Sequence, residues 1–262
     1  MADASAPAES VAKAHYLANA GVLIASGDTK VVFDPLFRND FGAYQLLPES
    51  LERALFAGEP PFDGIDAVLI SHYHEDHFSA VDILRLLEER PEIQLYAPTQ
   101  AMAEMRSIAG DRYRPVLDRV HEIALEYKDA PVTIEAGELL IEAVRIPHSG
   151  WPDARTDVEN IAFRVTLAEE TTALHLGDAD TSDAHYARDS EYWARRTADI
   201  AFPPYWYFAS EDGRVVLERL EPALAVGVHV PVEMARRPED RPAEMRGYDL
   251  FVKPGETREV PR

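Results

Sequence analysis

The sequence predicts an α+β protein in which two β-sheets pack face to face with helices on the outside. Short apolar runs, most of them bounded by Gly, Pro or Asp, recur along the chain and are typical of strands. The runs come in two batches, and helical patterns follow each batch, which favours two sheets that share one core. The chain of 262 residues is long enough for such a core, and no repeat or low-complexity linker divides it.

Ten runs are expected to be strands. The first batch lies at 16–25, 31–37, 67–71, 93–98 and 120–125. The second batch lies at 132–146, 160–167, 172–178, 198–204 and 223–230.

The clearest helical pattern is SAVDILRLLEER at 79–90. Ser79 and Asp82 have the spacing of a capping box, and Val81, Leu84 and Leu87 recur every three residues. Weaker helical patterns lie at 99–108, 183–196 and 211–220.

The chain is expected to form a flexible N-terminal tail at 1–13 and a single domain at 14–262. The tail contains small and polar residues, with its first cation at Lys13. The segment 238–247 is rich in Pro and charged residues and is interpreted as a loop within that domain.

Composition excludes several classes of function. With 26 Lys and Arg against 47 Asp and Glu, the formal net charge is −21, which disfavours a groove that grips nucleic acid through its phosphates. The absence of cysteine excludes disulfides, iron–sulfur clusters, thiolate zinc sites and a cysteine nucleophile.

No stretch of the sequence approaches the roughly 20 apolar residues that a membrane span needs. The N-terminal residues also lack the basic and apolar regions of a signal peptide. We therefore expect a cytoplasmic protein, with a periplasmic protein whose leader has been removed as the alternative.

The segment SHYHEDHFS (71–79) is the most informative part of the chain. It follows an apolar run and precedes the helix expected at 79–90. His72 and His74 are two residues apart, so they share a face only if the segment is extended. Imidazole is the commonest metal ligand, and a carboxylate such as that of Asp76 supplies oxygen beside it. The cluster indicates a metal site, and a solvated His-rich loop is the alternative.

The pattern His72-x-His74-x-Asp76-His77 resembles the signature of the metallo-β-lactamase superfamily. Three further matches follow in the family's order, each at or just after the end of an expected strand, and the resemblance extends from about residue 14 to 252. These matches are His148 in RIPHSG, Asp178 in LHLGDAD and His229 in AVGVHVP. The resemblance implies a four-layer αβ/βα sandwich that binds two divalent metal ions, with zinc expected and manganese or iron as alternatives.

The resemblance also implies how the ligands are shared. One metal would be held by His72, His74 and His148, the other by Asp76, His77 and His229, and Asp178 would bridge them. Asp180 and Asp183 are rivals for the bridging position, and Asp178 is preferred because it directly follows Gly177 and the strand. The remaining histidines are expected to be structural or exposed: His15, His121, His175 and His185.

Asp34, in VVFDPLF, has two interpretations. It could simply end a strand in an Asp-Pro turn. It could also accept a hydrogen bond from a ligand imidazole and so fix its tautomer. In members of the superfamily an early strand that ends in Asp-Pro approaches the metals, and this resemblance favours the second interpretation.

Two metals about 3.5–4 Å apart can share a hydroxide that attacks an ester, lactone, amide or phosphodiester. Asp76 and Asp178 would orient this nucleophile and the metals, and are the expected catalytic residues. With two aspartates and a hydroxide, the metals leave roughly one net positive charge in the pocket. The expected partner is therefore a small-molecule substrate, which can be anionic; the oligomeric state is not predicted.

Comparison with branches of the superfamily narrows the choice. His74 stands where the oxygen-reducing di-iron branch has Glu, which favours a hydrolase over a redox enzyme. β-Lactamases with a thiolate ligand are disfavoured because they need a cysteine, which this chain lacks. The early FDP, the HxHxDHF motif and the late PALAVGVHVP look most like the ascorbate-6-phosphate lactonase-like branch. Thioesterases and other β-lactamase-type members remain alternatives, and so does a metal-stabilised binding or scaffold protein without turnover.

Two aromatic clusters could line the substrate pocket. Trp151 follows His148 closely, with Arg155 as the nearest cation, and Tyr205, Trp206 and Tyr207 follow an expected strand. Such aromatics commonly pack in the core instead. If they line the pocket, Arg155 could pair with a substrate carboxylate or phosphate.

Overall fold

The computed structural model describes residues 11–111 and 114–261, and in these residues two seven-stranded sheets face each other. In spatial order the first sheet consists of β14 (Thr257–Glu259), β1 (Lys13–Ala18), β2 (Gly21–Ser26), β3 (Thr29–Phe33), β4 (Ala67–Leu69), β5 (Gln94–Pro98) and β6 (Val120–Ile123). The second consists of β13 (Asp249–Leu250), β12 (Leu224–Gly227), β11 (Ile200–Phe202), β10 (Thr171–His175), β9 (Ile161–Leu167), β8 (Leu139–Arg145) and β7 (Val132–Ala136).

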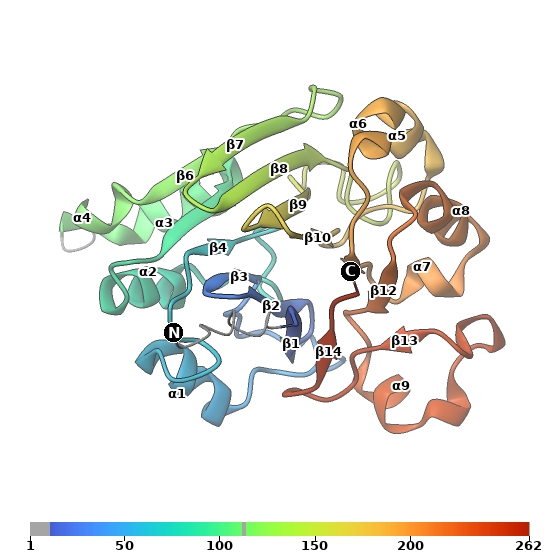
Figure 1. The fold of residues 1–262 in the computed structure, drawn as a ribbon, viewed down its shortest axis with the longest axis horizontal. Coiled ribbons are helices and arrows are strands. Elements are labelled where there is room, and N and C mark those ends of the chain that lie inside the picture. The colour runs from blue at the N-terminus through green and yellow to red at the C-terminus, as the bar shows by residue number, and fades with distance from the viewer. Residues whose placement is uncertain (1–10, 112–113, 262) are drawn as a thin grey trace, which may run out of the picture.

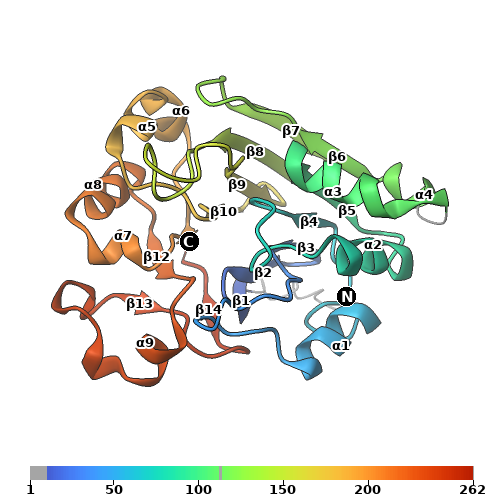
Figure 2. The same ribbon diagram turned by 180° about the vertical axis from the view of Figure 1, so that it is seen from behind.

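Helices cover the outer faces of the two sheets (Figures 1 and 2). The helices that follow strands of the first sheet are α1 (Glu49–Ala57), α2 (Ala80–Glu89), α3 (Thr99–Ala109) and α4 (Arg114–Leu117). Those that follow strands of the second are α5 (Asp183–Ala187), α6 (Ser190–Arg195), α7 (Trp206–Ala209), α8 (Glu211–Leu220) and α9 (Val232–Arg236).

The alternation of side chains along each strand builds two kinds of core. In β2, Val22 and Ile24 pack between the sheets with Phe163 of β9, whereas Leu23 packs in the outer cluster with Leu84 of α2. A separate outer cluster joins the second sheet to α5, α6 and α8. The four-layer αβ/βα sandwich is therefore confirmed.

Three predicted elements are divided in the structure. The run 16–25 forms β1 and β2 because a tight turn at Asn19 and Ala20 interrupts it, with Asn19 in the left-handed region at φ 47°. The run 132–146 forms the hairpin of β7 and β8 around Gly137, and 183–196 forms α5 and α6. Periodicity alone does not reveal these turns, because apolar residues continue on both sides of them.

Some boundaries and short elements also differ from the prediction. Strand β1 begins at Lys13, inside the range expected to be tail, while residues 1–10 lie outside the described residues. The sequence did not indicate α1, α4, α7, α9, β13 or β14, of which most are only two to five residues long. The expected loop 238–247 contains two short 3-10 turns at Pro238–Asp240 and Ala243–Met245.

Helix α2 begins where its capping signal predicts. The side chain of Ser79 accepts a hydrogen bond from the backbone of Asp82, and its hydroxyl lies 2.6 Å from the Asp82 carboxylate. Arg38, from the loop after β3, donates to the same carboxylate at 2.6 Å and 2.7 Å. The helix that follows the SHYHEDHFS segment is thus fixed at its first turn.

Parallel pairing of strands brings several loops that carry candidate site residues to one edge of the sandwich. Strands β3, β4, β5 and β6 run parallel, as do β10, β11, β12 and β13. Carboxyl ends of parallel strands lie at the same edge of a sheet, so the loops after β3, β4, β10 and β12 open there. Within the described residues, no helix has the length and apolar character that crossing a bilayer requires.

Candidate metal centre

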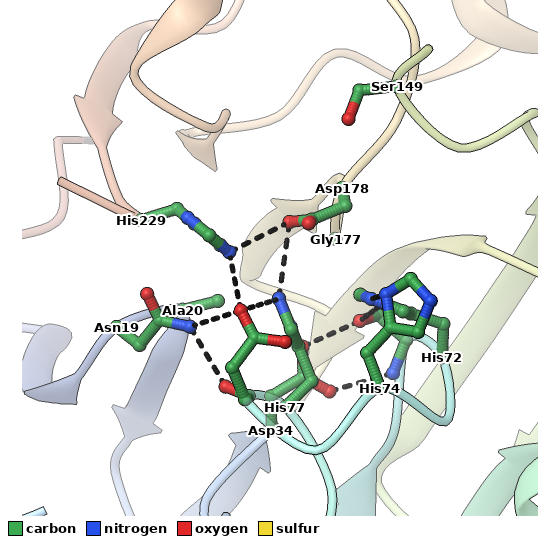
Figure 3. Close-up of polar contacts among 12 residues, drawn as sticks. Asn19, Ala20, Asp34, His72, His74, His77, Ser149, Gly177, Asp178 and His229 are labelled. Carbon is green, nitrogen blue, oxygen red and sulfur yellow. Dashed lines mark hydrogen bonds and ion pairs between the residues drawn. The ribbon is translucent and has the colours of Figure 1, made fainter. Parts of the chain in front are cut away.

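Seven imidazole and carboxylate side chains from four loops converge between the carboxyl edges of the two sheets. Figure 3 labels His72, His74, His77, Asp178 and His229 of this set. The loop after β4 supplies four of them, and the loops after β8, β10 and β12 supply one each. In loop order these residues are His72, His74, Asp76, His77, His148, Asp178 and His229. All of them were identified in the sequence as candidate ligands.

The side chains fall into three overlapping groups in which the candidate ligand atoms lie within 4.8 Å of one another. One group is His72, His74 and His148, and another is Asp76, His77 and His229. The third joins His72, His77 and Asp178 and so spans the first two.

Asp178 directs its two carboxylate oxygens toward different groups. Its Oδ1 lies 3.2 Å from Nε2 of His77 and 3.4 Å from Nε2 of His229. Its Oδ2 lies 3.3 Å from Nε2 of His148. Asp178 therefore has one carboxylate oxygen beside each of the two groups.

The neighbours of Asp178 explain its position. Its backbone N–H donates to Oδ1 of Asn160 at 2.8 Å. The preceding Gly177 has φ 55°, and a Cβ there would clash with Oδ1 of Asn160 and lie 2.6 Å from Cβ of Ser71. Only glycine fits this turn without displacing its neighbours.

The rival aspartates are engaged elsewhere. The Asp180 carboxylate accepts from the backbone of Ser182 at 2.9 Å and lies 3.3 Å from Nε2 of His185. Asp183 pairs with Arg219 at 2.5 Å. Neither aspartate belongs to a candidate ligand group of the described residues.

Asp34 lies beneath the centre, at the end of β3. One carboxylate oxygen accepts from the Ser71 backbone at 2.7 Å, and the other accepts from the Ser71 hydroxyl at 2.6 Å and from Nδ1 of His77 at 2.9 Å. The φ of 42° at Asp34 ends the strand earlier than the predicted 31–37. Asp34 therefore makes the imidazole contact expected of a residue that orients a ligand.

Hydrogen bonds fix the tautomers of three candidate ligands. A carboxylate can only accept, so His77 donates from Nδ1 to Asp34. His148 likewise donates from Nδ1 to the backbone oxygen of Ser149 at 2.9 Å. The Ser71 hydroxyl already donates to Asp34, so at 3.0 Å it accepts from Nδ1 of His72. In each ring the lone pair of Nε2 is left to face the centre.

The pKa values of several candidate ligands depart from their usual values. Burial and neighbouring imidazoles lower the pKa of His72 well below its usual value and that of His74 to about 4. Burial also opposes protonation of His77, but Asp178 and Asp76 outweigh it and raise its pKa. Burial would raise the pKa of Asp178, yet His229 and His77 hold it well below its usual range.

The residues fit a metal ion. Nε2 of His77, Nε2 of His148 and Oδ1 of Asp178 are buried and make no hydrogen bond among the described residues, although they face one another. Buried polar atoms are almost always satisfied, and such a set of nitrogen and oxygen atoms is the donor set of a borderline divalent cation.

A cavity of about 360 Å³ opens over the cluster. Besides five of the candidate ligands, it is lined by Phe41, Ala43, Tyr44, Ser149, Arg155 and Trp206. Of the five residues predicted for the pocket, Arg155 and Trp206 lie in this lining. The structure places Trp151 against Tyr127, packs Tyr205 beside Trp206, and buries Tyr207 with its hydroxyl bonded to the backbone of Asp180.

Sequence reasoning missed several residues at the centre. The Tyr44 ring packs edge-on against His229, with 4.1 Å between ring centroids, beside the predicted Trp206, which packs against the same imidazole at 5.3 Å. Asn19 and Asn160 bond the loops that carry Asp76 and Asp178. These are common residue types without a ligand-like spacing, so the signal is only their nearness to the motif loops in space.

The other four histidines have structural or peripheral surroundings in the structure. His175 donates from Nε2 to the backbone of Ala20 at 2.8 Å and stacks on Phe33. His185 bonds the hydroxyl of Tyr127 at 2.8 Å, and His121 contacts Gln94 on the surface. His15 pairs with Thr257 in the first sheet.

The fold and the chain resemble known proteins. A curated relative, Protein Rv0786c of Mycobacterium tuberculosis (strain ATCC 25618 / H37Rv), is 27% identical over 159 residues, which are 60% of this chain and 59% of the relative. The chain matches only part of the length of its curated relatives: 59% of this one and 26% of another.

Two solved structures share the fold at low identity. The metallo hydrolase Igni18 of Ignicoccus hospitalis KIN4/I is 18% identical with a TM-score of 0.59, over 95% of this chain and 98% of that one. The diiron β-hydroxylase CmlA of Streptomyces venezuelae is 16% identical with a TM-score of 0.54, over 97% and 55%.

The Beta-lactamase superfamily domain matches residues 29–230, which include all seven candidate ligands from His72 to His229 and the strands that precede them. This match covers more than half of the chain. The protein therefore belongs to the β-lactamase superfamily, in agreement with the resemblance of its motif to the metallo-β-lactamase signature.

Proposed function

We propose that the protein is a hydrolase that holds two divalent metal ions and acts on a small ester, lactone or phosphodiester. The observation that carries this proposal is the position of Asp178 between two three-residue ligand groups. His72, His74 and His148 would hold one ion, Asp76, His77 and His229 the other, and Asp178 would contact both.

Bound ions of this kind polarise a substrate oxygen and lower the pKa of a water molecule toward neutrality. The chain itself contributes orientation. Asp34 and the Ser149 backbone hold the imidazoles of His77 and His148 with their Nε2 lone pairs toward the centre. Asp76 and Asp178 keep negative charge where the ions and the attacking water must lie.

The cavity supports a small and partly apolar substrate. Its volume of about 360 Å³ lies at the lower end of the range for small-molecule pockets. Phe41, Tyr44 and Trp206 provide aromatic walls, whereas Ser149 and Arg155 provide polar groups. The Arg155 guanidinium and the two cations would favour an anionic group on the substrate despite the net charge of −21 of the chain.

The proposal also covers the identity of the bound metal and the branch of the superfamily to which the protein is most similar. Five imidazoles among seven donors favour zinc, and manganese or iron are the other candidates. Lactones and phosphodiesters are the first substrates to test, because the motif layout resembles the ascorbate-6-phosphate lactonase-like branch. The fold shared with CmlA gives a redox di-iron protein as a second candidate, but the ligand position at His74 differs from the Glu of that branch.

The test combines metal analysis with a substrate panel. We expect the full chain to hydrolyse at least one of a lactone, a phosphodiester, a thioester and a β-lactam, with two equivalents of zinc or manganese bound. His72→Ala should abolish this activity, because it removes a ligand from the centre. His121→Ala is the matched control, since His121 is an exposed histidine on β6, and it should behave as wild type.

Two results would contradict the proposal. A fully metal-loaded chain without turnover on the panel would indicate a binding or scaffold protein. A redox-active iron pair in the purified chain would favour the di-iron alternative.

A further inference from the structure

The turn between β1 and β2 reaches into the metal centre from a part of the chain that carries none of the candidate ligands. Its first residue, Asn19, is completely buried and has φ 47°, a conformation that asparagine tolerates better than most residues. Figure 3 shows the Asn19 side chain beside the cluster, below His229.

Asn19 contacts two candidate ligands in two different ways. Its side-chain Nδ2 donates to the backbone oxygen of Asp76 at 2.8 Å and lies 3.4 Å from the Asp76 carboxylate. Its backbone oxygen accepts from the N–H of His229 at 2.8 Å. Asp76 follows β4 of the first sheet and His229 follows β12 of the second, so a single residue joins ligands from both sheets.

These two ligands belong to the same group and meet each other. Nε2 of His229 lies 3.1 Å from Oδ2 of Asp76, the oxygen that Nδ2 of Asn19 also approaches. His229 itself has φ 60°, so its backbone needs support to keep this conformation. The Asn19 carbonyl supplies that support directly.

The turn is also held from the second sheet. Nε2 of His175 donates to the carbonyl of Ala20, and Nδ1 of the same ring accepts from the N–H of Gly177 at 3.2 Å. His175 therefore ties the turn to the residue that precedes Asp178. The position of Asn19 is fixed on both sides.

An amide suits this position better than other side chains. It donates N–H to an oxygen-rich neighbour without adding charge, whereas a carboxylate would repel Asp76 and an aliphatic side chain would donate nothing. Oδ1 of Asn19 is buried and has no hydrogen-bond partner among the described residues, so the donating half of the amide makes the contacts.

We propose that Asn19 is a positioning residue for the ion held by Asp76, His77 and His229, and that it sets the affinity of this ion without contributing to the ion of His72, His74 and His148. The inference rests on the proposed two-ion centre. Neighbours that orient metal ligands typically change metal affinity about 10–100-fold.

The test is a cobalt(II) titration of the metal-depleted full chain, followed by calorimetry and by the visible absorption of the bound ion. The variant is Asn19→Gly, which removes the amide and tolerates the positive φ. We expect wild type to bind two equivalents, and Asn19→Gly to bind the first with wild-type affinity and the second about 10–100-fold more weakly. Asn19→Ser is a second variant, because its hydroxyl ends one bond short of the amide, and it should weaken the same equivalent.

Asn39→Ala is the matched control. The Asn39 amide also donates to a carboxylate of this loop, that of Glu75 at 2.8 Å, but Glu75 is not in any ligand group. Both equivalents should bind to Asn39→Ala as they do to wild type. Thermal unfolding of each metal-free variant shows whether its fold is intact.

The outcomes separate this inference from the proposed function. Two wild-type equivalents with an unchanged second affinity in Asn19→Gly would overturn the role of Asn19 alone. Equal weakening of both equivalents would also overturn it, because it would show a general structural role. A wild-type chain that binds a single equivalent would contradict the two-ion centre and the role of Asn19 with it.

Discussion

At the scale of single residues, the backbone at Gly177 determines where Asp178 lies. The left-handed φ of 55° turns the chain out of β10, and the absence of a side chain lets Asn160 and Ser71 approach. The same Asn160 then accepts the N–H of Asp178. One glycine therefore couples the end of a strand to the carboxylate that faces both ligand groups.

Gly177→Ala should destabilise the protein by about 2–4 kcal/mol, because a left-handed alanine and a crowded Cβ both cost free energy. Denaturant unfolding measures the change. Gly137→Ala is the control, since Gly137 has φ 60° with open space around its Cβ, and it should cost only about 1 kcal/mol. Equal losses for the two variants would contradict the role of close packing at Gly177.

Arg155 is the residue through which the expected preference of the cavity for an anionic substrate can be tested. Its guanidinium lies at the cavity and donates to the backbone of Ser149 at 3.3 Å. Arg155→Ala should raise KM about tenfold for an anionic substrate and little for a neutral ester, because a charge-assisted contact is worth roughly 1.5–3 kcal/mol before solvent screening. Arg85→Ala, which alters an exposed ion pair on α2, should leave both KM values unchanged. Equal effects of Arg155→Ala on both substrates would refute the pairing.

At the scale of secondary structure, the first turn of α2 connects the ligand loop to its helix. Asp82 is buried and receives hydrogen bonds from Ser79 and from Arg38. Burial alone would raise the pKa of Asp82, but the bonds from Arg38 and Ser79 lower it below the usual value. The ionised carboxylate therefore stabilises the folded chain.

Asp82→Asn should lower the free energy of unfolding by about 1 kcal/mol at pH 7, a modest value because Arg38 is half exposed. A carboxylate whose pKa is lowered on folding stabilises above its unfolded pKa, near 4, and loses this effect as pH falls through the folded pKa. The difference between Asp82→Asn and wild type should therefore shrink below about pH 4. Unfolding curves at pH 7 and pH 3 measure it, with Glu89→Gln in an exposed pair as a control that should change little. A constant difference across this range would rule out the carboxylate as the cause.

Elements also show what sequence can and cannot predict. The helix at 79–90 was predicted correctly because a cap and an apolar face coincide locally, although Val81, which was expected on that face with Leu84 and Leu87, is exposed. The turn at Asn19 was missed because the apolar pattern continues across it, and only the left-handed backbone and the contact with Asp76 explain it. Strands β13 and β14 are too short to carry a pattern and depend on pairing with β12 and β1.

At the scale of the whole molecule, the fold brings together residues that lie far apart in the sequence. The seven candidate ligands could be named from the sequence because the HxHxDH motif by itself indicates a metal site, and its resemblance to the metallo-β-lactamase superfamily implies the three that follow. Their role as ligands remains a prediction. Asn160 and Tyr44 could not be chosen, because asparagine and tyrosine are common and act here only through neighbours that the two-sheet packing supplies.

The two-ion centre is tested most directly by anomalous X-ray diffraction at the zinc edge from crystals of the zinc-loaded full chain. We expect two anomalous peaks about 3.5–4 Å apart, one beside His72, His74 and His148 and the other beside Asp76, His77 and His229, with the Asp178 carboxylate between them. A single peak, or peaks away from Asp178, would contradict it.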